Sequence, residues 1–328
     1  METSRTLGRS GIQVSALGFG CWAIGGEWQT PDGQPLGWGK VDDDESVRAV
    51  RRALDLGVTF FDTADTYGTG HSERLLGRAL GKRRADVVVA TKWGNLFDER
   101  TRTADGQDAS PEHARSALTA SLTRLGTDYV DLYQLHISDA DPDHAARLRE
   151  VCEEFVRDGL VRAYAWSTDD PARAAVFAEG EHCTAVQHTL NVLQDAPGML
   201  ALCEASDLAS VNRSPLAMGL LTGRHSGRVA LEAGDIRSRP PAWLPGFGDG
   251  SGADPQWLAR VDALRDILTS GGRTLAQGAL AWIWARSPRT VPIPGFRSVA
   301  QAEENAGAIA KGPLTAGQLA EVDHILGR

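Results

Sequence analysis

Short apolar runs rich in β-branched residues alternate along this chain with longer segments in which apolar residues recur every three or four positions. The first pattern is typical of buried strands and the second of amphipathic helices. Eight strand-like runs cover residues 14–17, 58–61, 87–91, 129–135, 161–167, 185–187, 209–212 and 290–293. The pattern therefore predicts a repeated strand and helix unit.

The helix ends carry local signals of their own. Ser110 followed by Pro111 predicts a helix start, because the serine can cap the first turn and proline suits its first position. Three capping boxes, in which Gln follows Ser or Thr by three residues, predict later starts at Thr274 with Gln277, Ser298 with Gln301, and Thr315 with Gln318.

Eight such units in 328 residues fit an α/β fold of the (β/α)8 TIM-barrel type. The alternative, a doubly wound sheet, usually carries G-x-G-x-x-G after its first strand, and Gly18-Phe19-Gly20-Cys21-Trp22 lacks that spacing. No proline-rich linker divides the chain, so we expect one domain over residues 1–328. Two Gly- and Pro-rich stretches, 24–42 and 222–254, predict long loops at the C-terminal rim of the barrel.

Composition narrows the function classes. With 43 acidic and 34 basic side chains the net charge is -9, which argues against general nucleic-acid binding. No run of 18 apolar residues occurs and the N-terminus has no apolar signal core, so we expect a cytoplasmic protein without membrane association. The four cysteines lack disulfide or zinc spacing and are expected to be reduced and buried.

Four ionisable residues follow three neighbouring strands. Asp62 and Tyr67 follow the second strand-like run, Lys92 ends the third, and His136 ends the fourth. Because the carboxyl ends of barrel strands meet at one rim, these side chains are expected to converge on one pocket.

This set suits acid catalysis. A phenol is a weak acid at neutral pH, but an ammonium such as that of Lys92 favours its ionised form. A carboxylate such as Asp62 would keep the buried lysine charged. Tyr67 could then protonate a developing alkoxide while His136 orients a carbonyl oxygen. None of these groups donates a hydride, so redox chemistry would need a cofactor.

The chain resembles the aldo-keto reductase family over nearly its whole length, and in particular its bacterial NADPH-dependent members. Residues 5–20 are similar to the family's N-terminal β-hairpin and first strand. The motifs Phe61-Asp62-Thr63-Ala64 with Tyr67-Gly68, Thr91-Lys92 and Leu135-His136 match its catalytic tetrad. The resemblance implies reduction of an aldehyde or ketone, with Tyr67 as proton donor, tuned by Lys92 and Asp62, and His136 orienting the carbonyl.

The resemblance also implies NADPH rather than NADH as the cofactor. The residues implied in binding it are Ser167, Gln187, Arg213, Ser214, Leu216, Gly219, Gly295, Arg297, Gln301, Glu304 and Asn305. Four positions depart from the family pattern. Thr168 stands where Asn is usual, Arg213 where many members stack an aromatic ring on the nicotinamide, Gly295 in place of a lysine, and Gln301 in place of an arginine.

Trp22, Trp28 and Trp93 lie at or just after strand ends and are expected to line a pocket for a small carbonyl substrate. The second long loop adds Trp243 and Phe247. One alternative is a cofactor-binding regulatory subunit of the same fold with little turnover. Another, a metal-dependent hydrolase, lacks a His-x-His or clustered carboxylate motif at a strand end, so no metal is expected. The physiological substrate and the oligomeric state stay open.

Overall fold

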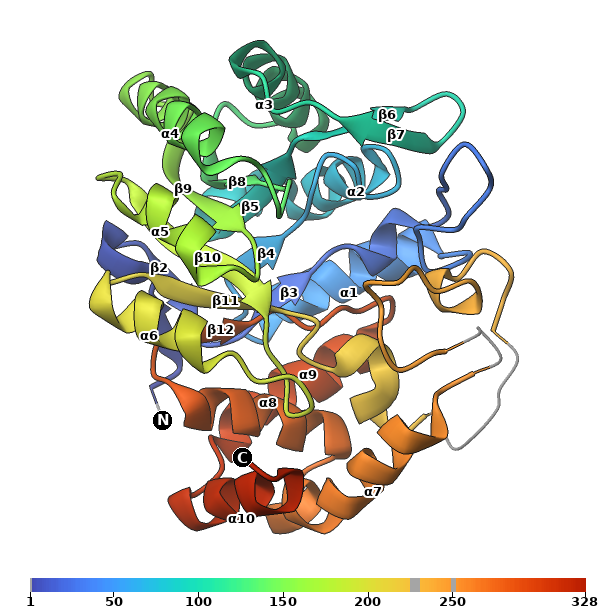
Figure 1. The fold of residues 1–328 in the computed structure, drawn as a ribbon. Helices are drawn as coiled ribbons and strands as arrows, with labels where there is room; N and C mark the ends of the chain where they lie inside the picture. The colour runs from blue at the N-terminus through green and yellow to red at the C-terminus, as the bar shows by residue number, and fades with distance from the viewer. Residues whose placement is uncertain (1, 225–230, 249–251) are drawn as a thin grey trace.

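Eight parallel strands form one sheet at the centre of the molecule (Figure 1). The computed structural model describes residues 2–224, 231–248 and 252–328. In spatial order the strands are β12 (Thr290–Pro292), β11 (Ala209–Arg213), β10 (Cys183–Thr189), β9 (Val161–Ser167), β8 (Val130–Leu135), β5 (Val88–Trp93), β4 (Phe60–Asp62) and β3 (Gly18–Gly20). The N–H of Gly20 donates to the carbonyl of Pro294 at 3.1 Å, so the first strand meets the segment after the last. The sheet is a nearly closed (β/α)8 barrel, which confirms the predicted fold.

Glycine makes this seam possible. A Cβ on Gly20 would lie 2.8 Å from the carbonyl oxygen of Ile293, and one on Gly18 would lie 2.9 Å from the side chain of the same residue. Both distances are shorter than a carbon atom tolerates. The first and last strands can therefore approach this closely only because glycine has no side chain.

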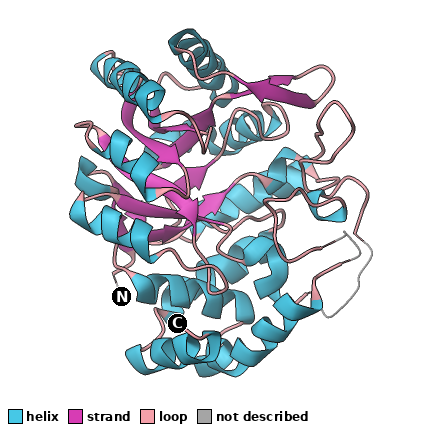
Figure 2. Ribbon diagram, in the orientation of Figure 1, coloured by secondary structure: helices cyan, strands magenta, loops and turns pink. Residues whose placement is uncertain are grey.

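The helices surround the sheet (Figure 2). The α-helices are α1 (Asp43–Asp55), α2 (His71–Leu80), α3 (Pro111–Leu125), α4 (Pro142–Arg157), α5 (Pro171–Ala178), α6 (Pro197–Ala205), α7 (Pro255–Thr269), α8 (Leu275–Arg286), α9 (Val299–Lys311) and α10 (Ala316–Leu326). Short 3-10 helices cover Gly8–Ser10, Ala23–Gly25, Gly81–Asp86, Ala217–Thr222, Ile236–Ser238 and Ser270–Gly272. Helix α3 begins where predicted, with the Ser110 side chain accepting from the N–H of His113 at 3.1 Å. None of the described helices is long and apolar enough to cross a membrane.

The first strand differs from the prediction. Residues 14–17 were expected to begin the barrel, but Gln13–Ser15 forms β2 and pairs antiparallel with β1 (Ser4–Thr6). This is the N-terminal hairpin that the family resemblance implies. The barrel strand is the following Gly18–Gly20, which carries two glycines and so lacks a β-branched run.

Two further details were not predicted. Strands β6 (Asn95–Asp98) and β7 (Thr103–Gln107) form a separate antiparallel hairpin whose polar sequence gives no strand signal. The capping boxes at Thr274 and Thr315 are complete, whereas the box at Ser298 is half formed. There the side-chain oxygen of Gln301 accepts from the N–H of Arg297 instead, at 2.7 Å.

Most side chains inside the barrel are small or β-branched and all are buried, including Val88, Ala90, Ala163, Ala165, Ala185, Ala209, Val211 and Val291. At the carboxyl ends of the strands this apolar packing stops and polar groups begin. The long loops gather at the same end (Figure 1), where Gln29 bridges to Thr103 of β7 and Trp38 bridges to Asp235. Residues 225–230 and 249–251 of the second predicted loop lie outside the described part of the chain.

Candidate active site

Asp62, Tyr67, Lys92 and His136 meet at the carboxyl ends of β4, β5 and β8. The Lys92 Nζ donates to Asp62 Oδ1 at 2.5 Å and to the carbonyl of Thr63 at 2.8 Å, and lies 3.1 Å from the Tyr67 hydroxyl. The Tyr67 and His136 rings stand edge to face with centroids 5.9 Å apart. The structure therefore brings together the four residues that were expected to converge.

Burial sets the charges of this group. The Lys92 side chain is fully enclosed, and although burial opposes its charge, Asp62 and Tyr67 together raise the pKa of Lys92. Burial also raises the pKa of Tyr67, and the nearby ammonium of Lys92 only partly opposes this. At neutral pH the lysine is therefore charged and the tyrosine keeps its proton. Lys92 does favour the ionised form of Tyr67, as expected from the sequence, but burial has the larger effect on the tyrosine pKa and raises it.

His136 is neutral at the same pH. Burial, and then the positive charges of Lys92 and Arg213, hold the pKa of His136 well below its usual range. Its Nδ1 is buried and has no hydrogen-bond partner among the described residues. A neutral imidazole can still donate a hydrogen bond to a carbonyl oxygen.

The turn that carries Tyr67 depends on two glycines. Gly68 has a φ of 59°, and a Cβ on it would lie 2.0 Å from the carbonyl oxygen of Gly25. A Cβ on Gly25 would in turn lie 2.9 Å from the backbone of Tyr67 and Gly68. The 3-10 helix Ala23–Gly25 thus packs directly on this turn and holds the tyrosine over Lys92.

Two glutamine side chains complete the surroundings of Asp62. The Nε2 atoms of Gln134 and Gln187 donate to Asp62 Oδ2 at 2.8 and 2.7 Å. Gln187 was expected from the family resemblance, whereas Gln134 was overlooked. Gln134 could have been found from its position two residues before His136. Alternate residues of a strand share a face, so this spacing places Gln134 on the same side of β8 as the site.

A cavity of about 1270 Å³ opens above these groups. Of the residues implied in cofactor binding, nine line it: Ser167, Gln187, Arg213, Ser214, Leu216, Gly219, Gly295, Arg297 and Gln301. Glu304 and Asn305 do not. The side chain of Asn305 instead donates to the carbonyl of Gly295 at 3.4 Å, and the carbonyl of Glu304 accepts from Gln277 at 2.9 Å.

The loop after β11 has an unusual backbone. Ser214, Ala217 and Met218 all have positive φ, at 52°, 46° and 54°. Side chains other than glycine adopt this conformation at a cost, and such strain gathers at ligand sites. Backbone N–H groups displayed by a loop of this kind suit an anion such as a diphosphate.

Arg213 is held at the cavity wall. Its guanidinium pairs with Asp169 at 2.6 Å and donates to the hydroxyl of Thr189 at 2.8 Å. The pairing with Asp169 was not foreseen, because the two residues lie 44 positions apart in the chain. It fixes the planar group at the cavity wall.

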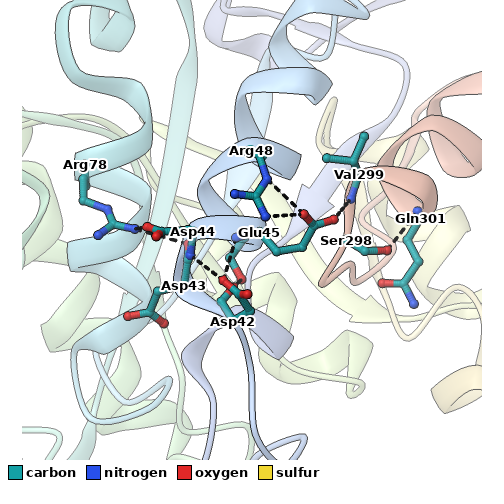
Figure 3. Close-up of polar contacts among 10 residues, drawn as sticks. Asp42, Asp43, Asp44, Glu45, Arg48, Arg78, Ser298, Val299 and Gln301 are labelled. Atoms are coloured by element: carbon teal, nitrogen blue, oxygen red, sulfur yellow. Dashed lines mark hydrogen bonds and ion pairs between the residues drawn. The ribbon is translucent and has the colours of Figure 1, made fainter.

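The far end of the cavity lies at the N-terminus of α9, beside α1 (Figure 3). The Arg297 guanidinium donates to the carbonyl of Trp38 at 2.8 Å, which fixes this cation at the cavity edge. The Glu45 carboxylate of α1 accepts from the N–H of Val299 at 2.8 Å and pairs with Arg48 at 2.8 Å. These two contacts, first the Val299 N–H and then Arg48, lower the pKa of Glu45. A negative side chain therefore already occupies part of this helix N-terminus.

Tryptophan side chains form part of the cavity wall. Trp22 stacks on Tyr67 with ring centroids 5.9 Å apart, and Trp28, Trp38 and Trp243 also line the cavity. Trp93 does not, contrary to our expectation. It is fully buried and stacks on Tyr133, because Lys92 faces into the barrel and the next residue must face outward. Phe247 is likewise fully buried and outside the cavity lining.

Within the described residue ranges, no three His, Cys, Asp or Glu side chains gather in a way that could hold a metal ion. The fold and site thus define a (β/α)8 barrel with a buried lysine, carboxylate and tyrosine cluster under a large cavity at the carboxyl ends of its strands. Barrels of this architecture carry enzyme active sites at this end.

Comparison with known proteins identifies the family. The model of the aldo/keto reductase family matches residues 16–326. The chain therefore belongs to the aldo/keto reductase family and is an oxidoreductase.

Similar proteins include the chloroplastic pyridoxal reductase of Arabidopsis thaliana, 32% identical over 91% of this chain and 80% of that protein. A solved structure of a glycerol dehydrogenase from Gluconobacter oxydans is 28% identical, with a TM-score of 0.80 over 99% of this chain and 95% of that one. An aldo/keto reductase from Klebsiella pneumoniae in complex with NADP and acetate is 25% identical, with a TM-score of 0.71 over 99% of this chain and 96% of that one.

Proposed function

We propose that this protein is an NADPH-dependent reductase of aldehydes or ketones. The observation that carries the proposal is the convergence of Asp62, Tyr67, Lys92 and His136 from three strand ends under one cavity. When bound, NADPH supplies the hydride that the carbonyl carbon accepts.

The residues of the chain supply the proton and the orientation. Tyr67 holds its proton at neutral pH and delivers it from the hydroxyl oxygen to the carbonyl oxygen as negative charge develops there. The charged Lys92, 3.1 Å away, stabilises the phenolate that is left. Asp62 keeps Lys92 charged, and the neutral His136 donates a hydrogen bond that directs the carbonyl oxygen toward Tyr67.

The cavity residues fit a nicotinamide dinucleotide. Ser167 and Gln187 would hold the nicotinamide amide, and Arg213 would lie against the ring or its amide. The strained loop with Ser214, Leu216 and Gly219 would take the diphosphate. Arg297, with Gly295 and Gln301 near the N-terminus of α9, would take the adenosine phosphate, and Asn305 would hold the carbonyl of Gly295 in place.

The substrate side is aromatic. Trp22, Trp28 and Trp243 line the cavity and would contact a carbonyl compound with apolar bulk. Pyridoxal and glyceraldehyde are sensible members of a first panel, because relatives of this chain are named as a pyridoxal reductase and a glycerol dehydrogenase.

The test follows NADPH absorbance during reduction of such a panel by the parent chain and by Tyr67→Phe. We expect the variant to bind NADPH and to turn over about 100- to 10,000-fold more slowly, because it lacks the proton donor. Equal rates would refute the role of Tyr67. Tight NADPH binding by the parent without turnover of any compound would favour a regulatory subunit instead.

A further inference from the structure

The carboxylate of Asp62 is held from both sides. Its Oδ1 faces the ammonium of Lys92, and its Oδ2 accepts hydrogen bonds from the side-chain amides of Gln134 and Gln187 at 2.8 and 2.7 Å. All four side chains are at least 98% buried, so water does not substitute for these contacts. Every oxygen of this buried charge therefore depends on a specific partner.

Gln134 uses both ends of its amide. While its Nε2 donates to Asp62, its Oε1 accepts from the Nε2 of Gln187 at 3.1 Å. The Nε2 of Gln187 is thus shared between Asp62 Oδ2 and Gln134 Oε1, and these two acceptors together hold the amide with Nε2 inward. Gln187 lines the cavity, and its Oε1 accepts no hydrogen bond from the described residues. Gln187 thus presents an acceptor to the cavity because Asp62 and Gln134 together hold its donor.

A small residue makes room for this contact. Gln134 lies on β8 and Gln187 on β10, with β9 between them. Ala165 of β9 pairs in register with Gln134, so its methyl group points into the barrel beside that amide. Ala165 is fully buried, and its small side chain leaves the space in which the two amides meet.

We propose that Gln134 is a positioning residue for the reduction, which ties the orientation of Asp62 to that of the Gln187 amide. This inference rests on the proposed function. Two neutral amide donors restrain the carboxylate without neutralising it, so Asp62 keeps its full charge and stays turned toward Lys92. A cation in the place of Gln134 would compete with Lys92 for that charge. The same amide contact couples the proton-donor side of the site to its cofactor side.

The first test is Gln134→Met, which keeps a similar volume but removes both the donor and the acceptor. We expect kcat to fall about 10- to 100-fold, as for loss of a hydrogen bond to a charged group, and the Kd for NADP+ to rise severalfold. Tryptophan fluorescence quenching measures the Kd without turnover. Thr184→Val is the matched control, because the Thr184 hydroxyl on β10 is buried and has no partner among the described residues.

The second test separates positioning from bulk stability. If Gln134 acts on the cofactor through Gln187, the rise in Kd that Gln134→Met causes should vanish in a Gln187→Met background. A merely structural role would give the same rise in both backgrounds. Ala165→Val keeps both amides but fills the space where they meet, and it should reproduce the direction of the Gln134→Met effects.

The outcomes are distinct. Unchanged kcat and Kd in Gln134→Met, or additive Kd effects in the double variant, would overturn the inference while leaving the reductase function standing. A parent chain that reduces no carbonyl compound would overturn the proposed function and the effect of Gln134 on kcat. In that case the NADP+ affinities of the single and double variants would still decide whether Gln134 orients Gln187.

Discussion

Replacing Asp62 by asparagine removes one charge from the centre of the site and changes the shape very little. Lys92 then keeps only neutral acceptors, the carbonyl of Thr63 and the hydroxyl of Tyr67. The side chain of Lys92 is fully buried, so solvent cannot take over the role of Asp62. We expect the pKa of Lys92 to fall, because burial then acts with little opposition.

The magnitude follows from the geometry. Two unit charges 2.5 Å apart attract by about 7 kcal/mol at an effective dielectric constant of about 20, before the cost of their desolvation. Removing one partner of a buried pair typically costs about 3 to 5 kcal/mol of stability, because the other charge is left uncompensated. We therefore expect Asp62→Asn to lose about 3 to 5 kcal/mol and to reduce carbonyl compounds at least about 100-fold more slowly.

Urea unfolding at pH 7 and initial rates of NADPH oxidation measure the two effects. The control is the double variant Asp62→Asn with Lys92→Met, which removes the stranded charge. Since replacing both members of a buried pair is often neutral, it should regain most of the lost stability. It should not regain activity, because Tyr67 still lacks a neighbouring cation.

A loss below about 1 kcal/mol in Asp62→Asn, together with a double variant no more stable than the single one, would refute the buried ion pair as the basis of this site. If the single variant is too unstable to purify, recovery of soluble, folded protein in the double variant gives the same information.

Two further predictions concern pH and the cofactor. Burial lowers the pKa of His188 from 6.5 to about 4, so between these pH values the unfolded chain binds a proton at His188 and the folded chain does not. The contribution of neutral His188 to folding stability is complete above about pH 6.5, and about 3 kcal/mol of it is lost as the pH falls toward 4. His188→Gln should therefore flatten the curve of urea midpoint against pH, whereas His324→Gln, at an exposed position, should not. Glu45→Gln removes a negative charge from the N-terminus of α9, so NADP+ should bind about two- to fivefold more tightly with little change for NAD+, as measured by fluorescence quenching. Equal changes for both nucleotides would show that Glu45 does not act on the additional phosphate.

Much of the fold could be read from local patterns. The run at 161–167 is strand β9 to the residue, and the other barrel strands from β4 onward differ from the predicted ranges only at their ends. The prediction of the first barrel strand was wrong because closure of the seam requires Gly18 and Gly20, and these glycines leave the strand without an apolar pattern. The hairpin of β6 and β7 was not predicted because its residues lie on a separate, partly exposed ribbon and so show no apolar pattern.

The candidate site was foreseen in part for the same reason. Strand ends locate Asp62, Lys92 and His136, since a parallel barrel brings its carboxyl ends together. Trp93 was misplaced because the alternation of the strand was not applied to the residue after Lys92. The pairs of Gln134 with Gln187 and of Arg213 with Asp169 join different strands or loops, and no spacing along the chain encodes those contacts.

The sequence by itself determined the periodicity of the strands and helices, the N-terminal caps of α3, α8, α9 and α10, and the types of ionisable group at the strand ends. These depend on residues within a few positions of one another, so they can be read directly from the chain. Only the tertiary structure decided which side chains touch across the barrel and which charge state each one takes. The Tyr67 hydroxyl shows the reason: its neighbour Lys92 favours ionisation, but burial opposes it more strongly, and burial depends on how the whole barrel closes around the site.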